Sequence, residues 1–358
     1  MKDGMRVFDA DLHTFELGDD WLRYLDKRFA SLLRSPSPCR VVTHSRESSS
    51  VHPHYRAAAA AGYDPASHLL AMDIEGTDVA VLYGTRGRHV QMWDDLEPQF
   101  ADALARAHNN WTHDFCAAEP ERLKFAAQIS YHDVHLAVRE VERAVEELGA
   151  VAVIGNPNPI NGRHIHDAYF DPLWRAIEQL CVPVCFHPTG VWTLRDDVGR
   201  RFIGHVGADM IANAARNPME LMLAFASLAV GGVLERHPAL YCGFLEGGCG
   251  WVPWWLTRLD DVWSTFPEDA DVMLSVAPSE YFARQCYVSI DADEKYLGGV
   301  VAAIGDANLV IATDYPHRDS LFPMAISALM ERKDLSLATK ERILWGNAAN
   351  LYRRATGC

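Results

Sequence analysis

Eight short apolar runs, spaced along the whole 358-residue chain, limit its fold more than any other feature. Each run is four to seven residues long, and amphipathic helical stretches separate the runs. The runs occupy residues 7–10, 79–83, 123–129, 151–154, 182–186, 240–245, 286–290 and 309–312. Strands that alternate with helices pair in parallel, so eight such units predict an α/β protein with a closed (β/α)8 barrel. The apolar content of 49% is ample for one core, and we expect a single domain over residues 1–358.

Helix signals lie between these runs. Asp133 is expected to cap a helix over residues 134–148, and the Asp171-Pro172 pair to open another that ends near residue 180. Pro218 is expected to start a helix that reaches residue 235. An open doubly wound sheet, the alternative α/β architecture, favours a Gly-rich phosphate loop after its first strand. Side chains that can bind metal occupy that position here, which favours the barrel.

The segment over residues 35–63 is too long and irregular for an ordinary turn. It contains Ser-Pro-Ser-Pro at residues 35–38 and three serines at residues 48–50. Long loops in compact domains are usually lids or binding loops, so we expect a long loop insertion after the first helix that covers the barrel mouth. A disordered surface insertion is the alternative. His52 and His54 are expected to face solvent.

The charge and cysteine content exclude several classes of function. The formal charge is −15 and the arginines are scattered among acidic residues, so no basic stripe is available for nucleic acid or for an anionic membrane. No apolar run approaches the roughly eighteen residues of a membrane span, and the first residues lack the order of a signal peptide. We therefore expect a cytoplasmic protein. The eight cysteines form no Cys-x-x-Cys pair, which indicates reduced core thiols.

Polar side chains follow most of the runs, at the points where the strands are expected to end. In barrels of this kind, the C-terminal ends of the strands meet at one mouth that carries the catalytic groups. Strict alternation along the first strand places Asp9, Asp11 and His13 on one face, with Glu16 on the loop beyond. The later runs are followed by Asn156, His187, Glu246, Asp291, Asp314 and His317. Carboxylates and imidazoles that converge on one mouth predict a metal centre.

Several of these residues also have a structural explanation. A lone His187 is more often a satisfied buried histidine, and its place among the other candidates is what favours a ligand role. Glu246 can pair with an arginine, but a buried carboxylate is costly without a cation or donors. His205, on the connection after the fifth run, is as readily a packing histidine as a metal ligand.

Candidate substrate-binding residues follow the fifth and sixth runs. Trp192 and Trp251 can exclude water from the mouth, and Arg195 and Arg201 can meet a carboxylate or a phosphate of a small-molecule substrate. A solvated charged face is an equal alternative for the arginines, because acidic residues lie beside them. Assembly into a homo-oligomer is left open.

These features resemble the amidohydrolase superfamily, in its branch of decarboxylases and related TIM-barrel metalloenzymes. The resemblance extends over the whole chain. It rests on Asp-x-Asp-x-His-x-x-Glu at residues 9–16, on His187-Pro188, on the Asp-Tyr-Pro-His sequence at residues 314–317 and on residues 346–352.

The chain departs from the pattern of that branch at four positions. Members usually carry a histidine at the place of Asp11 and a proline at the place of Glu16. Two-metal members commonly have a carboxylated lysine where Asn156 stands, and single-zinc members a histidine acid or base where Glu246 stands. The chain therefore lacks one residue that each of these two types of enzyme commonly uses.

The substitutions make the expected site rich in carboxylate. Asp11, Glu16, Glu246 and Asp314 carry four negative charges, and oxygen-rich ligand sets favour iron or manganese over zinc. One divalent ion leaves part of this charge uncompensated, which favours two metals bridged by a carboxylate. The pattern is similar to TIM-barrel non-haem diiron monooxygenases of the same superfamily. That resemblance implies an oxidoreductase with two iron ions, or manganese and iron, together with dioxygen and an electron donor.

Under this hypothesis the enzyme hydroxylates a C–H bond of an organic acid or its coenzyme A thioester, and Glu246 and His317 are its catalytic residues. One iron is held by Asp11, His13, His187 and Asp314, and the second by Glu16, Glu246 and His205.

Two other interpretations stay open. One zinc or manganese ion on Asp11, His13, His187 and Asp314 would support a non-oxidative decarboxylation or a hydrolysis, with Glu246 as general acid or base. The third is a degenerate barrel that only binds, and the cost of several unpaired buried carboxylates argues against it.

Overall fold

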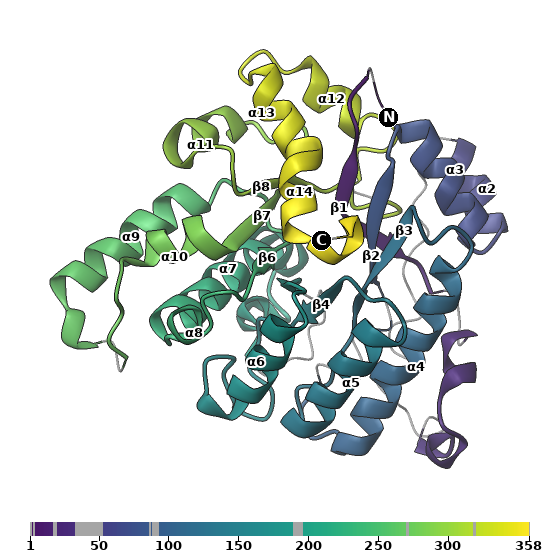
Figure 1. The fold of residues 1–358 in the computed structure, drawn as a ribbon, viewed down its shortest axis with the longest axis horizontal. Coiled ribbons are helices and arrows are strands. Elements are labelled where there is room, and N and C mark those ends of the chain that lie inside the picture. Colours follow the sequence, from purple (N-terminus) through teal and green to yellow (C-terminus); the bar gives the residue numbers. More distant parts are fainter. Residues whose placement is uncertain are drawn as a thin grey trace.

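The computed structural model confirms the predicted (β/α)8 barrel. It describes residues 2, 4–16, 20–32, 53–85, 87, 93–188, 196–269, 272–317 and 320–357. Eight parallel strands follow one another in chain order around a single sheet, and helices surround them (Figure 1). The strands are β1 (Phe8–Thr14), β2 (Val79–Gly84), β3 (Leu123–Ala127), β4 (Ala152–Gly155), β5 (Val184–Phe186), β6 (Cys242–Phe244), β7 (Cys286–Ile290) and β8 (Leu309–Ile311). Each overlaps one of the eight apolar runs.

Helical segments fill the connections. The α-helices are α2 (Pro53–Ala60), α3 (Pro65–Glu75), α4 (Pro98–Cys116), α5 (Val134–Glu146), α6 (Asp171–Gln179), α7 (Ala208–Val230), α8 (Val233–Arg236), α9 (Val252–Thr265), α10 (Pro278–Gln285), α11 (Leu297–Ile304), α12 (Ala325–Glu331), α13 (Leu337–Glu341) and α14 (Asn347–Leu351). The shorter helical segments are η1 (Asp20–Tyr24), η2 (Lys27–Phe29), η5 (Ala168–Phe170), η6 (Val198–Phe202), η7 (Pro267–Asp269), η8 (Arg342–Gly346) and η9 (Arg353–Thr356).

Two of the three helix signals are confirmed, and one is wrong. Asp133 caps α5 by accepting a hydrogen bond from the backbone N–H of Leu136 at 2.9 Å, and α6 begins at Asp171. Pro218 does not start a helix, because α7 begins ten residues earlier and contains it. The residues ahead of Pro218 include several alanines, whose strong helix propensity outweighs the local cost of the proline.

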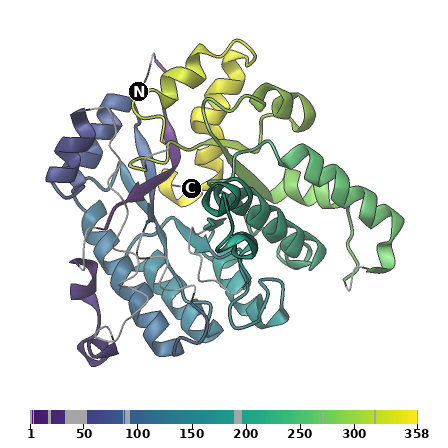
Figure 2. The same ribbon diagram turned by 180° about the vertical axis from the view of Figure 1, so that it is seen from behind.

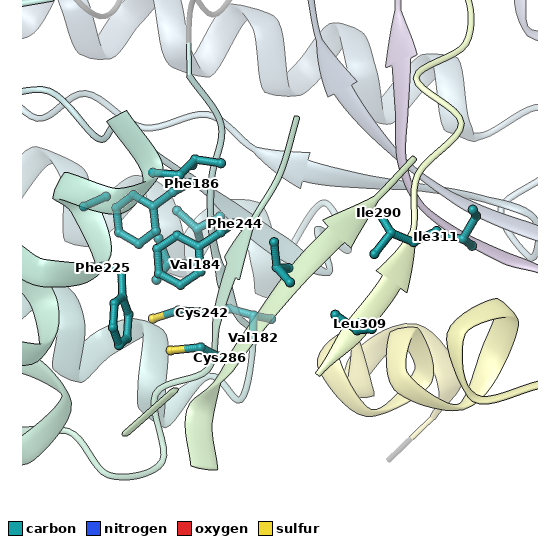
Figure 3. Close-up of a cluster of buried hydrophobic side chains, with 14 of the residues drawn as sticks. Val182, Val184, Phe186, Phe225, Cys242, Phe244, Cys286, Ile290, Leu309 and Ile311 are labelled. Atoms are coloured by element: carbon teal, nitrogen blue, oxygen red, sulfur yellow. The ribbon is translucent and has the colours of Figure 1, made fainter. Parts of the chain in front are cut away.

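Alternate residues of the strands pack into two buried layers, one inside the barrel and one between the strands and the helices. In the outer layer, Phe186 of β5 and Phe244 of β6 stack against each other, and Phe225 of α7 meets Phe244 edge to face (Figure 3). The inner layer includes Val81, Tyr83, Cys185 and Leu245. Tyr352 joins this layer and donates a hydrogen bond to the carbonyl of Ala10 at 2.8 Å, so the C-terminal segment closes the end of the barrel where the strands begin.

The C-terminal ends of the strands lie at the opposite end of the barrel, which is its mouth. In Figure 2 the teal segment with η6 and the start of α7 lies nearest the viewer at this end. Of the predicted lid, residues 35–52 lie outside the described part of the chain. His54 is not solvent-facing as expected, because it is buried in α2 and its Nε2 lies 3.0 Å from the Tyr315 hydroxyl. Among the described helices, none is both long and apolar enough to cross a membrane.

A bulge in β1 overturns the strict alternation expected for that strand. Asp9 pairs with Ala80, but Leu12 pairs with Leu82, so β1 contains one extra residue between them. Ala10 belongs to the inner layer and Leu12 to the outer one. The bulge therefore lets Asp11 and His13 share one site, while the carboxylate of Asp9 bonds to Thr313 beside β8.

Candidate metal centre

Four of the predicted ligands meet where strands β1, β5 and β8 end. Asp11, His13 and His187 form one group of donor atoms that all lie within 4.8 Å of one another. His13, Asp314 and His317 form a second such group, so the two groups share His13. The backbone joins the same elements, since Asp314 N–H donates to the carbonyl of Asp11 at 3.1 Å.

The donor atoms have the spacing of ligands around a single ion. The Nε2 atom of His13 lies 3.1 Å from the Nε2 atom of His187, 3.2 Å from Asp314 Oδ1 and 3.4 Å from Asp11 Oδ1. Asp11 Oδ2 lies 3.3 Å from the Nε2 atom of His187. Ligands about 2.1 Å from one metal are separated by roughly 3.0 Å at an octahedral edge and about 3.4 Å at a tetrahedral edge. Each of these separations is therefore that of two neighbouring ligands on one ion.

Asp11 provides an independent test of whether a cation fits. Its side chain is 1% exposed, yet neither carboxylate oxygen has a hydrogen-bond partner among the described residues. Burial raises the pKa of Asp11, and the neighbouring His187 opposes that rise. A buried carboxylate with no donor is costly unless a cation lies against it. The residues present therefore fit a bound metal ion.

The Nε2 atom of His13 is directed at the centre. A cation there would leave the ring proton on Nδ1, which lies 3.3 Å from the hydroxyl of Thr85 and would donate to it. Thr85 donates in turn to Nε2 of His317 at 3.1 Å, and Nδ1 of His317 then donates to Asp314 Oδ1 at 2.7 Å. This path of hydrogen bonds connects His13 with Asp314. Neighbouring groups orient the donors of a metal site in this way.

Glu246 lies on the other side of His187. Its Oε2 atom is 2.9 Å from Nδ1 of His187, and its backbone N–H donates to Ser289 Oγ at 3.0 Å. Glu246 has a φ of 63° and Asp314 a φ of 55°, in the left-handed region that few residues other than glycine adopt. Backbone strain of this kind is common at functional sites, where the surrounding structure enforces it.

A cavity of about 160 Å³ opens beside these residues. Five carboxylates contribute to its wall: Asp11, Glu246, Asp291, Asp293 and Asp314. Asn217 of α7 and Ser289 of β7 add neutral polar groups. No lysine or arginine of the described residues lines this cavity, so its own field is strongly negative and favours a bound cation.

The structure does not bring the other predicted residues into this cluster. Glu16 is buried with its Oε1 2.8 Å from Nε2 of His108 and 2.8 Å from the hydroxyl of Thr14. Arg201 lies in η6 and His205 just after it, and both are exposed. Trp251 is 9% exposed and packs edge to face on Phe244. Trp192 and Arg195 lie outside the described residues. The amide of Asn156 bonds locally to the backbone of Asn158.

Three residues that contact predicted site residues were not predicted from the sequence. Thr85, Ser289 and His108 contact His13, Glu246 and Glu16, respectively. Thr85 directly follows β2, and Ser289 lies in β7, so the rule that selected charged residues at strand ends passed over them because they are neutral. His108 lies inside α4, and only the folded chain brings it to Glu16.

Comparison with known sequences identifies the family. The family model described as Amidohydrolase matches residues 39–354. A 2-amino-3-carboxymuconate-6-semialdehyde decarboxylase of Dictyostelium discoideum is 27% identical over 287 residues, which are 80% of this chain and 76% of that protein. A gamma-resorcylate decarboxylase of Polaromonas sp. is 26% identical over 262 residues, 71% of this chain and 77% of its own.

Solved structures share the fold over nearly the whole chain. The 5-carboxyvanillate decarboxylase of Sphingomonas paucimobilis superposes with a TM-score of 0.75 at 22% identity, covering 98% of this chain and 99% of that one. A dihydroxybenzoic acid decarboxylase of Polaromonas sp. JS666, with bound manganese and 2-nitroresorcinol, gives a TM-score of 0.69 at 20% identity, covering 98% and 97%.

These relatives overturn the expected oxygen chemistry. The prediction of a diiron monooxygenase, and with it the assignment as an oxidoreductase, is wrong, because the curated relatives are decarboxylases. The two iron ions, dioxygen and an electron donor find no support. Glu16, expected to hold the second iron, is instead paired with His108.

Proposed function

Because this chain belongs to the amidohydrolase family, we propose that it is a metal-dependent decarboxylase that acts on a small organic acid. The observation that carries the proposal is the set of donor separations of 3.1 to 3.4 Å around His13, which suits one ion. The decarboxylases among the curated relatives support the reaction class.

The metal would be one divalent manganese or zinc ion held by Asp11, His13, His187 and Asp314. Two carboxylates and two imidazoles form a mixed oxygen and nitrogen set that accommodates either metal. Manganese in a solved structure of the same fold supports that choice. When bound, the ion supplies a Lewis acid that polarises the carboxylate or a neighbouring oxygen of the substrate.

Glu246 is the candidate for proton transfer. Decarboxylation breaks a C–C bond, releases carbon dioxide and leaves an electron pair on the carbon, which must then take up a proton. Glu246 lines the cavity and is 24% exposed, so a proton on its carboxyl group can reach that carbon. Its Oε2 atom lies 2.9 Å from Nδ1 of His187, so the carboxyl group is held beside one of the proposed ligands.

The size of the cavity limits the substrate. A volume of about 160 Å³ is close to that of a cavity that holds a single benzene ring. The five carboxylates in its wall repel an anion, so the substrate carboxylate would have to lie against the metal. A monocyclic carboxylic acid satisfies both conditions.

The test is anaerobic turnover with defined metal. Protein loaded with manganese or zinc is incubated without oxygen with a panel of monocyclic aromatic acids, and carbon dioxide and the product are measured. We expect turnover that a chelator abolishes. Glu246→Gln should lower kcat by roughly 10²- to 10⁴-fold with unchanged metal content, while the exposed α5 substitution Glu142→Gln leaves both unchanged. Absence of carbon dioxide from every acid would refute the proposal.

A further inference from the structure

We infer that Asp9 is a positioning residue, which sets the distance between the ligands Asp11 and Asp314 across the junction of β1 and β8. The inference rests on the metal site of the proposed function. Asp9 is fully buried and lies outside the ligand groups described above. What it contacts indicates its role.

The carboxylate of Asp9 holds the backbone beside both ligands, Asp11 and Asp314. Its Oδ1 atom accepts a hydrogen bond from the N–H of Asp11 at 3.2 Å and another from the N–H of Thr313 at 3.1 Å. Its Oδ2 atom accepts from the hydroxyl of Thr313. Thr313 directly precedes Asp314 in the chain, so a single side chain fixes one ligand on β1 and the residue next to the other ligand after β8.

The junction of β1 and β8 is where such a bridge is needed. The described strands form seven pairings, from β1–β2 to β7–β8, and the barrel closes without a regular ladder between β1 and β8. Two backbone hydrogen bonds span the junction, from Asp314 to Asp11 at 3.1 Å and from His13 to Tyr315 at 2.8 Å. The bulge displaces β1 next to them, and there the carboxylate of Asp9 accepts from Thr313.

The consequence for the metal is geometric. Ligands must be held to within about 0.5 Å for a metal site to bind well, and the groups that hold them commonly contribute 10- to 100-fold in affinity. Removing the carboxylate of Asp9 leaves the buried N–H groups of Asp11 and Thr313 without this acceptor. Both backbone segments then relax, and the separation of the two ligands is no longer fixed.

The test is manganese affinity, read from the electron paramagnetic resonance signal of free Mn²⁺, with cobalt absorption as a report on ligand geometry. Asp9→Ala should weaken manganese binding by about 10- to 100-fold and alter the cobalt spectrum. Asp9→Asn should stay within a few-fold of the original protein, because the amide oxygen still accepts both N–H groups and the amide nitrogen donates to Thr313. Thr313→Val, which removes one of the three bonds, should fall between them.

Asp78→Ala is the matched control. Asp78 also accepts a backbone hydrogen bond, from the N–H of Val7 at 2.8 Å, but Val7 directly precedes β1 and lies at the opposite end of the strand from the ligands. It should lower stability without changing metal affinity. Wild-type affinity in Asp9→Ala, or an equal loss in Asp78→Ala, would overturn the inference. If Asp9→Ala does not fold, Thr313→Val provides the test: an unchanged manganese affinity in that variant would overturn the inference. Metal titration needs no substrate. The role of Asp9 can therefore be tested even if the proposed decarboxylase activity is not found.

Discussion

At the scale of single residues, the centre depends on which nitrogen of each histidine faces the metal. Nδ1 of His187 has the carbonyl of Pro188 as its acceptor at 3.1 Å, and it also lies 2.9 Å from Glu246 Oε2. Nδ1 of His13 has Thr85. With a cation at the centre, both rings would present an unprotonated Nε2 to it, as a metal ligand requires.

Removing one imidazole ligand should remove the metal. In His187→Ala the centre loses one of four ligands and the contact that orients Glu246, so we expect substoichiometric metal after purification and no activity. Metal analysis of the purified protein gives the answer. Stoichiometric, tightly held metal in this variant would contradict the ligand assignment.

Thr85 should matter through the histidines that it connects. Thr85→Val keeps the shape of the side chain but breaks the path from His13 to His317, and we expect a loss of manganese affinity on the order of 10-fold. Thr112→Val is the matched control, because the hydroxyl of Thr112 lies 3.2 Å from Nδ1 of His108, a histidine outside the centre. Equal affinities in the two variants would show that the path is unimportant.

At the scale of elements, η6 and α7 are joined by buried charged groups beside the mouth. Asp197 forms an ion pair with Arg216 at 2.9 Å, and Glu220 accepts a hydrogen bond from the N–H of Val198 at 2.7 Å. Burial raises the pKa of Glu220 from 4.5 to about 7, with Asp197 adding to the rise and Arg216 opposing it. This contact is therefore sensitive to pH.

The sign of that sensitivity follows from proton binding. Above about pH 4.5 the folded protein retains a proton on Glu220 that the unfolded chain releases, so the free energy of unfolding falls as pH rises to about 7. The total loss is at most on the order of 3 kcal/mol. Glu220→Gln keeps the acceptor and removes the titration, so its stability relative to the original protein should increase from pH 5 to pH 8.

Urea denaturation at both pH values measures this difference. Glu146→Gln, on the exposed side of α5, is the control, since a solvated side chain contributes little to stability. A Glu220→Gln variant whose relative stability is the same at pH 5 and pH 8 would exclude the assigned titration.

At the scale of the whole molecule, the proposed metal would join strands that are far apart in the chain. The ligands come from β1, β5 and the segment after β8, so a bound ion connects the first and last strands of the barrel through one point. Anything that binds only the folded state raises its stability by mass action.

Chelation should therefore lower the melting temperature. At a metal concentration 100 times the Kd, binding contributes about 2.7 kcal/mol. The unfolding entropy of a chain of this length is about 0.75 kcal/mol per kelvin, so we expect a fall of about 3 to 4 °C. Calorimetry with chelator and with manganese restored measures it. His187→Ala should show no metal-dependent shift, whereas a full shift in that variant would place the ion elsewhere.

The sequence by itself determined the barrel and the positions of its strands. Apolar runs and helix caps are local signals, and all eight runs overlap observed strands. The rule that catalytic groups follow parallel strands also brought forward Asp11, His13, His187 and Asp314, which the structure places together. The strand predictions succeeded because periodicity and strand order are properties of the local sequence, whereas the assignment of these four residues as ligands stays a prediction.

Only the tertiary structure decided which carboxylates belong to the centre. One extra residue in β1 leaves the carboxylate of Asp9 outside the ligand groups, and His108, 92 positions further along the chain, pairs with Glu16. Neither event has a local signature, because a bulge interrupts the two-residue period and a pairing between β1 and α4 exists only after both have packed. Of the four carboxylates behind the two-metal prediction, Glu16 pairs with His108, whereas Asp11, Glu246 and Asp314 line one cavity.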